Sequence, residues 1–205
     1  MDGLLFRGEN ANSRPMPDAL VLLKTRKSIS APFLAEPAPS EAQLAEMLTI
    51  ASRVPDHGKL TPWRFILYRG EARRQAGEAL ASLYLACKPG ADPKLVEEER
   101  TRFTKAPLVV GVVSKAAPHP KIPEFEQLLS AGNAAMNLEL AAQALGFASQ
   151  WKTGWVAYDA EAGRILGLKE GERFVGLVHI GTATVPPVDR PRPPLADIVS
   201  EWKPA

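Results

Sequence analysis

Three polar clusters interrupt otherwise apolar segments of the sequence, and they are its best candidates for chemistry. They span residues 25–28, 53–57 and 151–154. In the first cluster, the cations Arg26 and Lys27 and the hydroxyl of Ser28 could bind phosphate oxygens through charge-assisted hydrogen bonds. A solvated helix end would have the same composition. The cluster therefore predicts a phosphate-bearing ligand, with a simple helix end as the alternative.

The other two clusters also allow two interpretations each. Residues 53–57 are dense in constrained and titratable side chains, with Pro55, Asp56 and His57 in a row, although an ordinary loop between helices could look the same. Residues 151–154 follow a predicted strand, and ligands often bind at strand ends in α/β folds. Trp151 alone is more typical of a core residue than of a stacking platform.

The motifs of the common nucleotide, metal and hydrolase sites are absent from the sequence. It contains no Gly-x-Gly-x-x-Gly or Gly-x-x-x-x-Gly-Lys-Ser/Thr motif and no Gly-x-Ser-x-Gly elbow. The three histidines are far apart in the chain, which argues against a metal site. Cys87 is the only cysteine, so an internal disulfide is excluded, and we expect a reducing compartment.

Length, charge and composition indicate one ordinary globular domain. The chain has 205 residues, of which 45% are hydrophobic, and 25 Lys and Arg residues balance 23 Asp and Glu residues. A formal charge of +2 is too small to predict a nucleic-acid surface. The first nine residues lack the apolar core of a signal peptide, and the apolar stretch 128–145 carries too many polar side chains to span a bilayer. We therefore expect a cytoplasmic protein without a membrane or nucleic-acid partner.

Hydrophobic spacing and capping residues predict alternating helices and strands. We expect helices over residues 17–24, 71–86, 94–104 and 124–144, a helix that starts at Ser40 and stops before Pro55, and a short helix capped by Asp159. Strands are expected over residues 63–68, 108–113 and 174–180, with strand and turn over 147–155.

The predicted helix 124–144 is apolar around most of its circumference, so it should have packing partners on several sides. Its polar residues Glu126, Ser130, Asn133 and Asn137 fall on one narrow stripe. The chain divides into an N-terminal arm (1–16), a domain (17–184) and a proline-rich C-terminal arm (185–205), which we expect to lie on another surface.

Taken in order, a series of short segments resembles the nitroreductase family, most closely its compact branch of NAD(P)H nitroreductases. The likeness covers residues 18–184, and its specificity lies in the order and spacing of the pieces. They are Arg26-Lys27-Ser28, 35–39, Arg53-Val54-Pro55-Asp56-His57, Pro62-Trp63-Arg64-Phe65, 105–107, Glu126-Gln127 with Ser130-Ala131-Gly132, Gly146-Phe147, Trp151-Lys152-Thr153-Gly154 and 176–182.

The resemblance implies an α+β, nitroreductase-like three-layer fold, with a mixed central sheet flanked by helices. It also implies a homodimer that exchanges its C-terminal arms and binds FMN without a covalent bond at the subunit interface. The long apolar helix would then pack across the dimer axis, and the isolated monomer should be poorly stable.

Carried over by motif, the resemblance assigns FMN ligands to all three polar clusters. The phosphate, the ribityl chain and one flavin edge would be contacted by Arg26, Lys27 and Ser28. The other flavin edge would be lined by Trp151, Lys152 and Thr153. From the neighbouring chain, the flavin would be contacted by Arg53 and His57. The NAD(P) segment of the compact branch corresponds to Ala141, Ala142, Gln143, Ala144, Leu145 and Gly146.

The implied activity is a ping-pong transfer of hydride from NADH or NADPH through FMN to a nitroaromatic, a quinone or a related small-molecule acceptor. No side chain is expected to act as an obligatory acid or base. A cation such as Arg26 or Lys27 near the flavin would ease hydride acceptance, and a backbone amide of residues 151–154 could contact flavin N5.

Three alternatives stay open. They are another reaction on the same fold, such as reductive dehalogenation with residues 94–104 as a substrate lid, a flavin storage protein with little turnover, and an interaction domain without nucleotide.

The sequence departs from the family pattern at two places. Lys27 stands where the compact branch usually has a second Arg, and a lysine lacks the bidentate geometry of an arginine. Thr61 precedes Pro62-Trp63 where the broader family often has an amide side chain. Arg190 and Arg192 could add phosphate contacts, although solvated charges in a proline-rich arm are the simpler interpretation.

Overall fold

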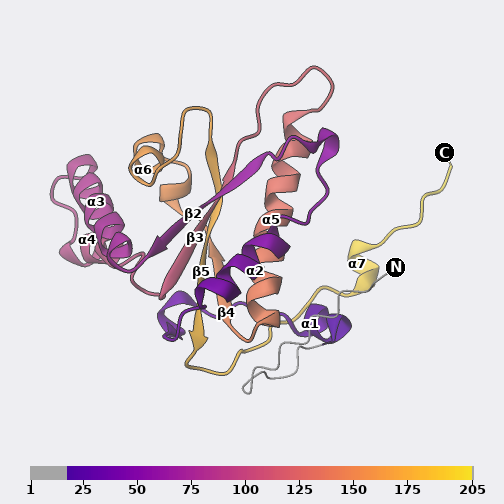
Figure 1. Ribbon diagram of the computed structural model, residues 1–205, viewed down its shortest axis with the longest axis horizontal. Helices are drawn as coiled ribbons and strands as arrows, with labels where there is room; N and C mark the ends of the chain where they lie inside the picture. Colours follow the sequence, from indigo (N-terminus) through magenta and orange to yellow (C-terminus); the bar gives the residue numbers. More distant parts are fainter. Residues whose placement is uncertain (1–17, 205) are drawn as a thin grey trace.

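A computed structural model describes residues 18–204, in which a five-stranded sheet lies between two layers of helices (Figure 1). The predicted N-terminal arm, residues 1–16, lies outside the described residues. The strands are β1 (Leu34–Ala35), β2 (Trp63–Arg69), β3 (Leu108–Ser114), β4 (Ala148–Lys152) and β5 (Arg173–Ala183). The helices are α1 (Ala19–Thr25), α2 (Glu41–Ala51), α3 (Glu71–Cys87), α4 (Pro93–Arg100), α5 (Glu124–Ala144), α6 (Ala160–Ile165) and α7 (Leu195–Ile198), with 3-10 turns at Ala31–Phe33, His57–Lys59 and Trp155–Ala157.

The predicted α+β class and the helix-flanked sheet are confirmed. The sheet has the order β1-β5-β3-β2, with β4 also paired to β5. All four pairings between the described strands are antiparallel, so the parallel component of a mixed sheet is not among them. β3 and β4 both pair with β5, and α5 connects them by crossing one face of the sheet.

Each face of the sheet carries its own hydrophobic core because side chains alternate along the strands. Val110, Val112 and Val178 face α2 and α5, where they pack with Met47 and Leu138. On the other face, residues that include Val109, Leu177 and Phe103 pack with Leu80 of α3. This second layer consists of α3, α4 and α6 (Figure 1).

Two of the predicted helices begin at the caps that the sequence indicated. Ser40 and Gln43 form the predicted capping box at the start of α2. The Asp159 side chain accepts a hydrogen bond from the Ala162 backbone N–H at the start of α6. α5 covers the predicted residues 124–144. None of the described helices is both long enough and apolar enough to cross a membrane.

The main differences from the prediction are two boundaries, which shift because of tertiary contacts, and one additional helix. The helix expected over 94–104 ends at Arg100, since tight turns follow and bury Phe103 against Tyr68, with 4.7 Å between the ring centroids. β5 continues beyond residue 180 to Ala183, because Thr182 and Ala183 pair with β1.

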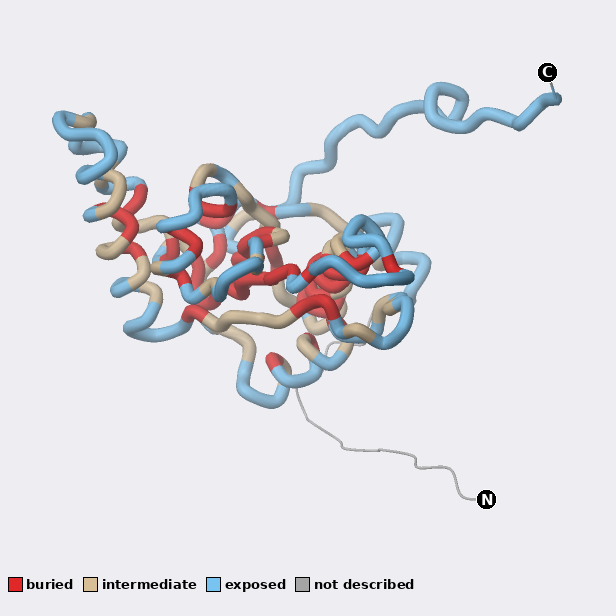
Figure 2. Tube along the Cα trace, turned by 90° about the horizontal axis from the view of Figure 1, so that it is seen from above, coloured by how far each residue is buried: buried red, intermediate tan, exposed pale blue. Residues whose placement is uncertain are grey.

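The third difference is α7, which forms inside the proline-rich arm after Pro194. Pro194 is the N-cap residue of α7, and the backbone N–H that proline lacks would have no partner within the helix at this position. Residues 188–204 are exposed and extend away from the sheet and its helices (Figure 2).

Candidate functional site

Two of the three polar clusters meet beside β4. The chain that leaves Ser28 runs along this strand, and the Ile29 backbone N–H donates to the Ser149 carbonyl oxygen at 3.0 Å. Further on, the Ala31 N–H donates to Oε1 of Gln150 at 2.8 Å. The cluster 25–28 is therefore held next to the strand that ends in the cluster 151–154.

The cations of the first cluster are partly buried and incompletely paired. The Arg26 and Lys27 side chains are 21% and 24% exposed. Arg26 Nη1 lies 3.5 Å from Ser28 Oγ, and Lys27 Nζ lies 3.8 Å from Asp189 Oδ2 in the C-terminal arm. Five guanidinium N–H donors with such loose contacts fit an additional anion. This donor set suits the phosphate and hydroxyl groups of the FMN that the resemblance implies.

The third cluster, residues 151–154, has backbone N–H groups without hydrogen-bond acceptors among residues 18–204, whereas its tryptophan is part of the core. Trp151 packs on the core between the sheet and α5, and its Nε1–H donates to the Val175 carbonyl oxygen at 3.2 Å. A Cβ at Gly176 would lie 1.9 Å from Trp151 Nε1, so only glycine allows this packing. In the described part of the chain, the N–H groups of Thr153 and Gly154 have no hydrogen-bond acceptor. These two groups are available to a ligand.

Lys152 points to the opposite face of the sheet from Trp151, as alternation along β4 requires. Burial lowers the pKa of its ammonium group, and the nearby cations Arg102 and Lys105 lower this pKa further. The side chain thus lies among charged residues of both signs, because Glu99 and Glu98 also act on it, while its backbone continues the edge formed by residues 151–154.

The polar stripe of α5 holds the second cluster. Ser130 Oγ donates to the Pro55 carbonyl oxygen at 2.5 Å, and Asn137 Nδ2 donates to the Arg53 carbonyl oxygen at 3.0 Å. Glu126 Oε2 lies 2.8 Å from His57 Nδ1. Three of the four residues on the predicted stripe therefore fix residues 53–57 against α5.

The end of this loop has unusual backbone geometry. Lys59 and Thr61 have φ angles of 56° and 47°, which side chains other than glycine rarely adopt. The Asp56 carboxylate compensates by accepting hydrogen bonds from the N–H groups of Leu60 at 3.0 Å and Thr61 at 2.9 Å. Asp56 thus sets the shape of the loop and is not a candidate ligand.

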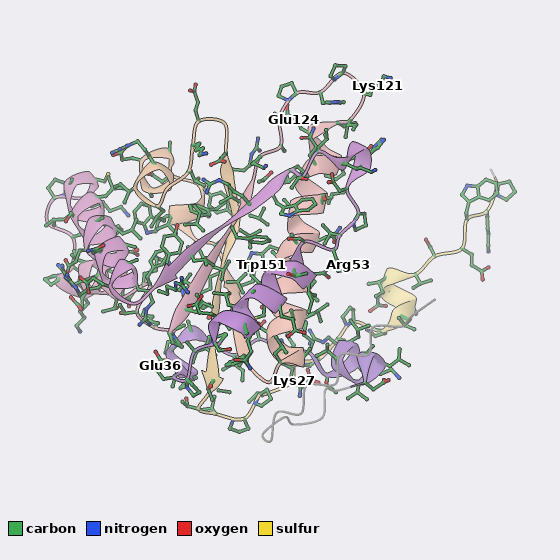
Figure 3. All side chains as sticks on the ribbon, in the orientation of Figure 1. Lys27, Glu36, Arg53, Lys121, Glu124 and Trp151 are labelled. Carbon is green, nitrogen blue, oxygen red and sulfur yellow. The ribbon has the colours of Figure 1, made fainter. Side chains whose placement is uncertain are left out.

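α5 separates the second cluster from the other two within one chain. Figure 3 shows Trp151 and Arg53 on either side of this helix. Among residues 18–204, no hydrogen bond or ion pair joins Arg53 or His57 to Arg26, Lys27 or Ser28, or to residues 151–154. A single subunit therefore brings two of the predicted clusters together, and the third stays apart.

The predicted NAD(P) segment forms the last turn of α5 and the following turn. Ala141 and Ala142 are 2% and 0% exposed, so their side chains contact the core. Gln143 and Gly146 line a cavity of about 270 Å³ together with Thr25, Lys27 and Pro187 of the C-terminal arm. Because the carbonyl groups at a helix C-terminus repel phosphate, an anion in this cavity would have to contact Lys27, which is the only cation among the described residues that line it.

Sequence reasoning did not single out Glu139. This residue of α5 is 3% exposed, and its carboxylate accepts hydrogen bonds from Ser149 Oγ and from the Trp151 backbone N–H. The available signal was an acidic residue inside the most apolar helix. A group of three or more His, Cys, Asp or Glu residues suited to a metal ion is not found in residues 18–204.

Comparison with known proteins agrees with this architecture. A model of the nitroreductase family matches residues 23–182. Over 165 residues the chain is 37% identical to the "Putative NAD(P)H nitroreductase YdjA" of Escherichia coli K12, which covers 80% of this chain and 88% of that protein.

Solved structures show the same fold. A nitroreductase-like family protein from Bacillus cereus superimposes with a TM-score of 0.77 at 24% identity, covering 93% of this chain and 99% of that one. The FMN- and NADPH-dependent nitroreductase NfnB of Sphigopyxis sp. strain HMH gives a TM-score of 0.67 at 20% identity, covering 91% and 99%. The match of sequence and fold over most of its length shows that this chain belongs to the nitroreductase family.

Proposed function

We propose that this protein is an FMN-dependent NAD(P)H oxidoreductase that reduces nitroaromatics, quinones or a related acceptor in a ping-pong cycle. One observation carries the proposal: the clusters 25–28 and 151–154, far apart in the sequence, meet beside β4 with unpaired donors. The family membership and the FMN and NADPH dependence of NfnB, a structural relative, support it.

In this proposal the residues of the chain bind and orient, and FMN supplies the transfer of hydride. Arg26 and Lys27 hold the phosphate and ribityl groups, and Ser28 adds a hydroxyl contact. Their positive charge also favours the reduced form of a bound flavin, which gathers negative charge. The free N–H groups of Thr153 and Gly154 would donate to the flavin edge. No side chain of the site needs to act as an obligatory acid or base in this proposal.

The complete site in this proposal needs two chains. Arg53 and His57 lie across α5 from the other clusters, so in a homodimer they would reach the partner's flavin. α5 leaves Phe125 and Leu129 68% and 52% exposed, and Gly132 has open space around it. Such an apolar strip is typical of a subunit interface.

The domain limits and the arms form part of the same proposal. Residues 17–184 would make up the catalytic domain and residues 185–205 the exchanged arm. Leu195, Ile198, Val199 and Trp202 of this arm are more than 60% exposed. A partner subunit would bury them.

The nicotinamide nucleotide would bind over the same flavin and contact the segment Ala141 to Gly146. Because Ala141 and Ala142 are buried, the nucleotide would be contacted by Gln143, Ala144, Leu145 and Gly146.

Steady-state oxidation of NADH and NADPH, with and without added quinone, tests the proposed function. We expect quinone-dependent oxidation that requires FMN. A protein that binds FMN but shows no acceptor-dependent turnover would be a storage protein and would refute the proposed activity.

A further inference from the structure

Glu139 is a buried carboxylate that contacts both halves of the candidate site. Its Oε1 accepts hydrogen bonds from Ser149 Oγ at 3.1 Å and from the Trp151 backbone N–H at 3.2 Å. Its Oε2 lies 3.9 Å from Nη1 of Arg26. One side chain of α5 thus joins the segment 26–28, which lies beside β4, to the strand itself.

Burial of this carboxylate needs a functional or structural reason, because a buried charge is costly unless it is paired. Two neutral donors and one guanidinium surround it, and its side chain is 4% exposed. Arg26 is the only cation within 4 Å of Glu139 in the described part of the chain. In the same described part of the chain, Glu139 is also the only carboxylate within 4 Å of Arg26.

The geometry at Arg26 shows what the carboxylate can do. A guanidinium group is planar and carries its N–H donors in a fixed fork, so an anchor on one edge sets the direction of the others. Arg26 makes one further contact, with Ser28 Oγ at 3.5 Å. Its remaining donors are free to bind a second anion.

We propose that Glu139 is a positioning residue that orients Arg26 toward the phosphate of FMN, while it fixes the strand backbone at Trp151. This inference rests on the proposed function, because it requires FMN to bind beside β4. Glu139 itself does not touch the cofactor. It acts through Arg26, so its effect depends on the phosphate group and on the presence of Arg26.

Riboflavin, which lacks the phosphate, separates this role from a structural one. Protein freed of flavin is titrated with FMN and with riboflavin, and quenching of flavin fluorescence gives each Kd. For Glu139→Gln, which keeps the size and removes the charge, we expect the Kd for FMN to rise about tenfold, as for the loss of one charge-assisted contact. The Kd for riboflavin should stay within about twofold of the wild-type value.

A double-mutant cycle tests whether the effect passes through Arg26. Arg26→Ala should weaken FMN binding, and adding Glu139→Gln to it should cause no further loss. Glu124→Gln changes an exposed carboxylate on the same helix and serves as the matched control, with both Kd values unchanged. Thermal unfolding of the flavin-free variants reports whether they fold.

Several outcomes would overturn the inference. An equal loss of FMN and riboflavin binding, or an undiminished effect of Glu139→Gln in the Arg26→Ala protein, would mean that Glu139 only supports the fold. If Glu139→Gln does not fold, Glu139→Asp keeps the charge but withdraws it from Arg26, and the same selective loss of FMN binding is expected. A wild-type protein that binds neither flavin would instead refute the proposed function.

Discussion

Gln143 and Lys27, which are 116 residues apart, are joined by two hydrogen bonds between a side-chain amide and the backbone. The Lys27 N–H donates to Gln143 Oε1 at 3.4 Å, and Gln143 Nε2 donates to the Lys27 carbonyl oxygen at 3.0 Å. The last turn of α5 therefore holds the cluster 25–28 in place. Figure 3 shows Lys27 near this end of the helix.

Replacing Gln143 should loosen this cluster and weaken FMN binding. Gln143→Ala removes both hydrogen bonds, and at about 1 kcal/mol for each bond we expect the Kd for FMN to rise by up to about thirtyfold. Gln143→Glu should weaken binding more, because a carboxylate oxygen would face the Lys27 carbonyl oxygen. Fluorescence titration measures both, with Asn133→Ala on the exposed side of α5 as control. An unchanged Kd in Gln143→Glu would mean that the pair does not organise the site.

Exchange of defective subunits tests the shared site. In a mixed dimer of one Arg26→Ala chain and one Arg53→Ala chain, one site would lack both arginines and the other would be intact. We expect this dimer to bind one FMN with wild-type affinity, whereas both mutant homodimers bind FMN weakly. Two differently tagged, co-expressed chains allow the mixed dimer to be purified and titrated.

The matched control places both substitutions in one chain and pairs it with a wild-type chain. Each site would then lack one arginine, so no tight FMN site should remain. Tight binding in this control but not in the mixed dimer would show that each site is built within one chain.

Asp56 should contribute to stability because it holds an unfavourable loop backbone. Asp56→Ala leaves the N–H groups of Leu60 and Thr61 without their acceptor, and we expect the free energy of unfolding to fall by about 2 kcal/mol. Adding Thr61→Gly should restore part of the loss, because glycine adopts a positive φ without strain. Urea unfolding measures both, and Asp197→Ala in the exposed α7 should change little. A neutral Asp56→Ala would contradict this role.

His179 should make stability depend on pH. Burial is the main cause that lowers the pKa of this imidazole to about 4. In the unfolded chain the pKa returns to about 6.5. Between about pH 4 and pH 6.5 the unfolded state therefore binds a proton at His179 that the folded state does not bind. The contribution of His179 is therefore complete above about pH 6.5 and is lost as pH falls toward 4, by about 3 kcal/mol in total.

Urea unfolding at several pH values between 4 and 7.5 checks this expectation. His179→Gln should flatten the pH dependence in this range, whereas a substitution of the exposed His119 should not. A profile for His179→Gln that falls as steeply as the wild-type profile would assign the effect to other groups.

Local features of the fold could be predicted from the sequence, because local physics determines them. The Ser40–Gln43 capping box and the apolar run of β3 depend on neighbouring residues, and both appear as expected. The polar stripe of α5 was also visible, since it follows from helical periodicity. Its partners, the carbonyl groups of Arg53 and Pro55, could not be read from periodicity.

Long-range contacts explain what the sequence did not reveal. The contacts of Glu139 with Arg26 and Trp151 form only because α5 packs on β4 and the chain after α1 runs beside that strand. Both of these packings are long-range, so the sequence did not indicate them. The end of α4 depends in the same way on the burial of Phe103.

The close packing of α4 on α3 argues against the substrate lid suggested for residues 94–104. α4 packs on α3 so closely that a Cβ at Gly77 would lie 1.9 Å from the Arg100 carbonyl oxygen. A moving lid would have to break this contact, which favours the hydride-transfer activity over a lid-dependent reaction.

The visible spectrum of the purified protein, followed by anaerobic addition of NADH or NADPH, tests the central claim most directly. We predict a flavin spectrum that bleaches with at least one nucleotide and returns when a quinone or nitroaromatic is added. A colourless protein that takes up no added FMN, or a bound flavin that neither nucleotide reduces, would contradict the account.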